Sequence, residues 1–145
     1  MPVYYDIDPD LNLVVYVCNG TFNASEFFKT GDKVAFDPRL RPLMNIIIDA
    51  SQAYLEVSIF DLHFALEKSK ESKRMGKEIG RTAVLTKSSS LNFLAEAFKL
   101  MSPEAPSNFG IFNTQKDVIR WLDLPEEAVH RFWQQLKEQA RSNQP

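Results

Sequence analysis

The chain has 145 residues, 44% of them hydrophobic and 25% charged, and its 17 Lys and Arg residues stand against 19 Asp and Glu residues for a formal charge of −2. This length suits one domain with one core, so we interpret residues 1–145 as a single domain. The near-neutral charge excludes the strongly basic domain of a dedicated nucleic-acid binder, and a lone cysteine excludes an internal disulfide.

The chain opens with two runs rich in Val, Tyr and Ile, residues 3–7 and 11–18, separated by Asp8-Pro9-Asp10. This pattern predicts an antiparallel hairpin. A capping box, Asn23 with a glutamate three residues later, then precedes apolar residues spaced by three and four. These features predict a first helix over about 24–36.

The next predicted strand covers 43–49, because Ile46-Ile47-Ile48 shows no polar alternation and is typical of a strand covered on both faces or at the sheet centre. Ser58 and Asp61 form a second capping box, which predicts a helix running to about Met75. A short buried strand follows at 82–86.

Three hydroxyl residues, 88–90, precede apolar positions typical of a third helix, which ends before Pro103. The last predicted strand is 109–112. Thr114 and Asp117 form a third capping box at the start of a short helix. Pro125 suits the first turn of a terminal helix, which carries an apolar stripe: Val129, Phe132, Trp133, Leu136 and Ala140.

The predicted order is therefore β-β-α-β-α-β-α-β-α plus a C-terminal helix. It indicates an α/β fold with a mainly parallel sheet, right-handed crossovers and an antiparallel edge strand. Crossovers of one hand leave one face of the sheet less covered. The terminal stripe either covers that face within the chain or pairs across a two-fold axis, and we expect a homodimer.

The residues that usually carry catalysis or bind metals are sparse. His63 and His130 have no second histidine or cysteine at ligand spacing, so we expect no metal. Cys18 fits a small buried apolar residue better than a nucleophile. The five glycines match no phosphate-binding fingerprint, and we expect no cofactor and no enzymatic activity.

Two groups of polar residues remain as candidates. Residues 68–81 carry six basic against two acidic side chains, a local charge of +4. This indicates either a solvated helix C-terminus or a docking surface for an acidic protein or an anionic membrane. The candidate partner surface is Lys70, Lys73, Arg74 and Lys77.

The second group follows the predicted strands at their carboxyl ends, where parallel sheets bind ligands. Its members are Asp49, Ser51, Ser89, Ser90 and Thr114. Backbone N–H groups at helix starts can hold an anion there. The alternative is that each polar side chain simply caps a helix.

In element order, the chain resembles the SpoIIAA-like group of the STAS superfamily, the anti-sigma-factor-antagonist fold, which is akin to half of the Sec14 lipid-transfer fold. The resemblance rests also on Asn45-Ile46-Ile47-Ile48-Asp49 as the central strand, on the helix opening at Ser58, and on Asp117-Val118-Ile119-Arg120-Trp121-Leu122 as the closing helix. It covers about residues 3–123, and the added terminal helix, 124–141, lies outside it.

The resemblance implies a non-enzymatic, bacterial-type regulatory module that docks to another protein. By position, it also implies that Ser58 is the residue a partner kinase phosphorylates, while the residue itself suits a helix cap. The alternative function, suggested by the Sec14 kinship, is binding of a small apolar or amphipathic ligand. With no apolar run near the about 20 residues that span a bilayer and no basic N-terminal region, we expect a cytoplasmic protein.

Overall fold

The computed structural model describes residues 3–56, 59–74, 80–87, 96 and 108–142. Its strands are β1 (Val3–Asp8), β2 (Leu13–Asn23), β3 (Asn45–Glu56), β4 (Thr82–Leu85) and β5 (Phe109–Phe112). Its helices are α1 (Ala24–Ala35), α2 (Ile59–Arg74), α5 (Gln115–Leu122) and α6 (Glu126–Ser142). The predicted third helix falls in 88–101 and lies outside the described residues.

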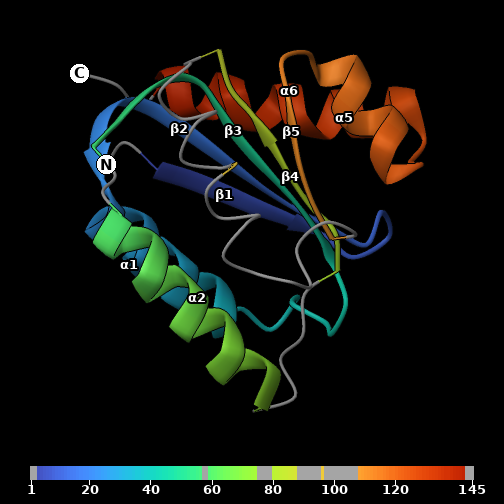
Figure 1. Cartoon of the computed structure of the whole chain (residues 1–145). Helices are drawn as coiled ribbons and strands as arrows, with labels where there is room; N and C mark the ends of the chain where they lie inside the picture. Colours follow the sequence, from blue (N-terminus) through green and yellow to red (C-terminus); the bar gives the residue numbers. More distant parts are fainter. Residues whose placement is uncertain (1–2, 57–58, 75–79, 88–95, 97–107, 143–145) are drawn as a thin grey trace.

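The strands form one sheet in the order β1-β2-β3-β4-β5, with β1 antiparallel to β2 and every other pair parallel. Each new parallel strand is added on the same side of the last, so right-handed crossovers place their helices on one face. Figure 1 shows α1 and α2 on that face and α5 and α6 across the other. The predicted α/β class with an antiparallel edge strand is confirmed.

Side chains of β2 alternate between the two layers, as the two-residue period of a strand requires. Leu13, Val15 and Val17 belong to the cluster that includes α5 and α6. Val14, Tyr16 and Cys18 belong to the cluster that includes Val34 of α1. The first part of β2, residues 13–18, is therefore buried on both faces.

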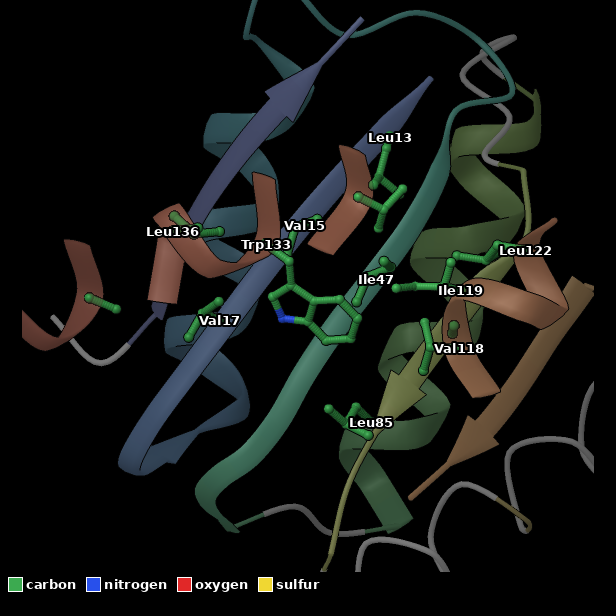
Figure 2. Packing of buried hydrophobic residues seen from close by; sticks show 13 residues of the cluster. Leu13, Val15, Val17, Ile47, Leu85, Val118, Ile119, Leu122, Trp133 and Leu136 are labelled. Carbon is green, nitrogen blue, oxygen red and sulfur yellow. The ribbon is translucent and has the colours of Figure 1, made fainter. Parts of the chain in front are cut away.

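Helix α6 packs its apolar stripe on the sheet face that the crossovers leave open. Val129, Trp133, Leu136 and Ala140 are each at most 3% exposed. Figure 2 shows the Trp133 indole among Val15, Val17, Ile47 and Leu85. The structure thus decides between the two alternatives for this stripe: it is buried within the chain, and pairing across a two-fold axis does not use it. A homodimer stays a prediction.

β3 is seven residues longer at its carboxyl end than the predicted 43–49, and this overturns two expectations. Asp49 and Ser51 lie inside the strand and not in a turn after it. Val17 pairs with Asp49 and Asn19 with Gln52, so β3 has one extra residue at a bulge. A bulge lets the strand continue through polar residues that sequence patterns assign to a loop.

β3, which carries Ile46-Ile47-Ile48, is the central strand of the sheet, which confirms one of the two alternatives expected for this run, but it is not fully covered on both faces. Ile47, which faces α6, has no exposed surface. Ile46 and Ile48, which face the α1 layer, are only partly buried. β2 also runs past its predicted end at Cys18 as far as Asn23, because its residues 19–23 pair with β3. Gly20 within this stretch adopts a φ of 69°, which glycine tolerates.

Candidate functional site

A buried carboxylate occupies the centre of the sheet on the α6 face. Asp49 is 1% exposed, and its Oδ2 accepts a hydrogen bond of 2.8 Å from the Trp133 indole Nε1. Its Oδ1 accepts from the Ser51 hydroxyl at 2.6 Å and from the Ser51 backbone N–H at 3.0 Å. The Asp49 side chain thus satisfies the backbone N–H of the residue at the bulge.

Helix α6, which carries Trp133, also supplies the cation nearest to Asp49 in the described part of the chain. The Lys137 Nζ lies 3.8 Å from Asp49 Oδ2, and the Lys137 side chain is 21% exposed. Trp133 and Lys137 are four residues apart, so both project from one face of α6. A buried carboxylate is costly without partners, and these contacts fix the position of α6 on the sheet.

Cys18 lies on the opposite face of β2 and is buried. Burial and the negative charge of Asp49 raise the pKa of its thiol far above the usual value. The thiol is therefore protonated at neutral pH, in agreement with the expectation of a small buried apolar residue and not a nucleophile.

The three predicted ligand residues that the structure describes do not converge on one site. Asp49 and Ser51 are brought together, but their polar atoms bond each other and α6. Thr114 caps α5, where its hydroxyl accepts from the Asp117 N–H at 3.2 Å. The candidates Ser58, Ser89 and Ser90 lie outside the described residues, so phosphorylation of Ser58 stays a prediction.

The predicted partner surface is described at two of its four positions. Lys70 and Arg74 are exposed on α2, four residues apart. The Lys70 Nζ lies 3.7 Å from a carboxylate oxygen of Glu67. The side chain of Lys73 and all of Lys77 lie outside the described residues.

Beside this surface lies an aromatic contact between α1 and α2 that the sequence analysis missed. Phe28 and Phe64 pack edge to face with ring centroids 4.9 Å apart. Lys68 Nζ lies 5.7 Å from the Phe28 ring centroid and 5.5 Å from that of Phe64. The same Nζ is 3.3 Å from Asp32 Oδ1. Phe64 remains 49% exposed. Phe64 was not singled out from the sequence, and only the packing of α1 beside α2 reveals this contact.

A second polar cluster fixes the loop between α1 and β3. Arg39 donates from Nε and Nη2 to the two Asp37 carboxylate oxygens, at 3.1 and 3.0 Å, and from Nη1 to Asp6 Oδ1 at 2.6 Å. The Tyr5 hydroxyl donates to Asp37 at 3.0 Å. Hydrogen bonds from Arg39 hold the pKa of the Asp37 carboxyl far below its usual value. Burial and the bond to Asp37 raise the pKa of Tyr5.

In the described part of the chain, no three or more His, Cys, Asp and Glu side chains are grouped so as to hold a metal ion. The helices described there include none with the length and apolarity needed to cross a membrane. His63 and His130 are both exposed on helix surfaces.

The chain thus forms an open α/β sheet with an antiparallel first strand, α1 and α2 on one face and α5 and α6 on the other. The structure is similar to the crystal structure of an uncharacterized DUF3478-family protein with a SpoIIAA-like fold from Shewanella loihica PV-4, with a TM-score of 0.50. Sequence identity is 17%, and the match covers 83% of this chain and 91% of that chain. This likeness shows the fold alone.

The sequence matches no protein-family model. It has no significant match among curated proteins either.

Proposed function

We propose that the protein is a non-enzymatic regulatory module that acts by docking to another protein. The observation that carries this proposal is the state of Asp49. The acidic residue that the sequence places at a ligand-binding strand end is 1% exposed, with both carboxylate oxygens bonded to the chain itself. This carboxylate holds α6 in place and is not presented to a substrate.

The fold supports the same proposal. The SpoIIAA-like arrangement is the one in which anti-sigma-factor antagonists work by binding a partner protein, and the sequence resembles that group. Fold likeness is compatible with many functions, so the proposal rests on the fold together with the internal use of Asp49.

Native gel electrophoresis tests the proposal. The chain, produced at its natural level, is compared in a fresh cell extract and after purification to homogeneity. We expect the extract to show a discrete species larger than the purified form, and mass spectrometry of that band to identify a second protein in fixed ratio. A homodimer survives purification and is thereby distinguished. Identical migration in extract and purified sample contradicts the proposal.

Binding of a small apolar ligand is the second candidate, and one observation favours it. On the central strand, Ile47 has no exposed surface, whereas Ile46 and Ile48 on the α1 face are only partly buried. Native mass spectrometry of freshly purified protein tests this candidate. A mass above that of the polypeptide, released by organic solvent, supports a ligand. The bare polypeptide mass contradicts it and leaves docking as the proposed function.

A further inference from the structure

The charge of the protein is unevenly distributed along the chain. Residues 68–81 carry +4 in a chain whose total is −2, so all other residues together carry −6. The described parts of this segment are residues 68–74, in the C-terminal half of α2, where Lys70 and Arg74 are exposed, and residues 80–81, where Arg81 packs on the Trp121 ring away from α2. A surface of this sign attracts a negatively charged partner and speeds its association.

Among the α2 side chains that the structure describes, the exposed ones lie on one side of the helix. At about 100° per residue, His63, Glu67, Lys70 and Arg74 fall within about 60° of the helix circumference. All four are exposed. Phe64 borders this face on the side of α1. We call these five residues the α2 face.

Phe64 provides an apolar anchor of fixed position. Its ring packs against Phe28, and Lys68, bonded to Asp32, lies over both rings. Half of Phe64 is still exposed, at 49%. An aromatic side chain that is already held in place loses little conformational entropy when a partner covers it, which is typical of residues that dominate binding energy.

The acidic residues of this region indicate which negatively charged partner fits. Glu67 lies among the cations of the α2 face and is 3.7 Å from the Lys70 ammonium, and Glu71 is exposed beside it. An anionic membrane presents one sign of charge and repels both glutamates. A protein helix can set carboxylates against the cations and neutral side chains against the glutamates.

We propose that the α2 face is the docking surface for an acidic amphipathic helix of a partner protein. This proposal rests on the proposed function and names its surface and the chemistry of its partner. Lys70 and Arg74 are one helical turn apart, about 6 Å along α2. The partner helix therefore carries two carboxylates at positions i and i+4, and an apolar side chain on the same face that covers Phe64.

Two designed helical peptides serve as probes: one with a leucine anchor and Glu at i and i+4, the other identical but with Lys at those two positions. Fluorescence anisotropy measures their affinity for the purified full chain. We expect the acidic peptide to bind the wild type at least about tenfold more tightly than the lysine peptide, an effect that salt reduces. Equal affinities, or no binding of either peptide, overturn the proposal.

Charge reversal on the protein locates the site. In the Lys70→Glu/Arg74→Glu variant the preference inverts, so the lysine peptide binds more tightly. The matched control is Lys116→Glu/Arg120→Glu, which reverses two exposed cations, also four residues apart, on α5 across the sheet. We expect the control to retain the wild-type preference. An equal loss in both variants shows unspecific attraction and overturns the proposal.

Two further measurements separate the alternatives. Phe64→Ala weakens both peptides by a similar factor and leaves their ratio unchanged, while circular dichroism confirms an intact fold. Sedimentation with vesicles of phosphatidylcholine and phosphatidylglycerol tests whether the α2 face binds an anionic membrane. If the wild type binds these vesicles and Lys70→Glu/Arg74→Glu does not, the proposal is overturned. If the complex in cell extract persists unchanged in that variant, the partner docks elsewhere: this inference fails, and the docking function stands.

Discussion

Replacing Trp133 by phenylalanine tests whether the hydrogen bond to Asp49 holds α6 on the sheet. The indole has no exposed surface, and its Nε1 donates at 2.8 Å to a carboxylate that is 1% exposed. Phenylalanine keeps an aromatic ring at the same position but removes the N–H and part of the ring volume. The buried oxygen of Asp49 then loses this donor.

The expected loss of stability has two parts. A hydrogen bond to a charged group contributes about 1.5–3 kcal/mol to stability. The smaller ring leaves a cavity of about 40 Å³, which costs about 1 kcal/mol at the measured cost per volume. We therefore expect Trp133→Phe to lower the free energy of unfolding by about 3 kcal/mol and the melting temperature by about 10 °C.

Urea unfolding followed by far-ultraviolet circular dichroism measures this loss. Lys137→Met is the control on the same helix, because Lys137 approaches Asp49 only at 3.8 Å and is partly exposed. We expect it to cost less than about 1 kcal/mol. A larger loss for Lys137→Met than for Trp133→Phe contradicts the assignment of the indole as the main anchor.

A double-mutant cycle isolates the hydrogen bond from the cavity. In an Asp49→Ala background the acceptor is already absent, so Trp133→Phe should cost only the cavity part, about 1 kcal/mol. If Trp133→Phe costs the same in the wild type and in the Asp49→Ala background, the hydrogen bond contributes nothing and the reasoning is refuted.

Three further predictions concern the rest of the fold, each measured by thermal or urea unfolding. Gly80→Ala places a Cβ 2.7 Å from the Leu43 carbonyl oxygen and should lower stability by about 2 kcal/mol. At Gly31, inside α1, an added Cβ has no atom within 4 Å, so Gly31→Ala should raise stability by about 1 kcal/mol. Equal effects of the two substitutions contradict this prediction. Leu43→Asn should stabilise the protein by about 1 kcal/mol, because leucine is unfavourable at a φ of 64° and its side chain is 57% exposed. A lower melting temperature of this variant contradicts the prediction. Because Arg39 lowers the pKa of Asp37 in the folded protein, the ionised Asp37 stabilises the fold fully above its unfolded pKa of about 4, and this stabilisation is lost as the pH falls toward the folded pKa. Asp37→Asn should thus lose less stability than the wild type between pH 6 and pH 3. Parallel plots of unfolding free energy against pH for the two proteins argue against this prediction.

Local patterns were sufficient for most elements of the fold. The Thr114 capping box predicts the start of α5, which the hydroxyl of Thr114 caps. The stripe that includes Trp133 predicts the inward face of α6. Strand and helix alternation predicts a mainly parallel sheet with an antiparallel edge, and the structure confirms it. These features depend on residues a few positions apart, whose period and chemistry are visible in the chain.

The candidate site was predictable only in part. Asp49 and Ser51 were singled out, but as residues at the end of a strand. The bulge that extends β3 depends on pairing with β2, and no local pattern encodes a register between strands. Phe64 was not singled out, because its half-exposed contact with Phe28 depends on how α1 packs beside α2.

The sequence by itself determined the order of the described elements and the apolar face of α6, because these follow from short-range periods. Only the tertiary structure decided where that face is buried and what Asp49 does. The hydrogen bond from Trp133 joins residues 84 positions apart. A buried carboxylate takes its role from the groups that folding brings to it, and those groups come from parts of the chain that no local pattern connects.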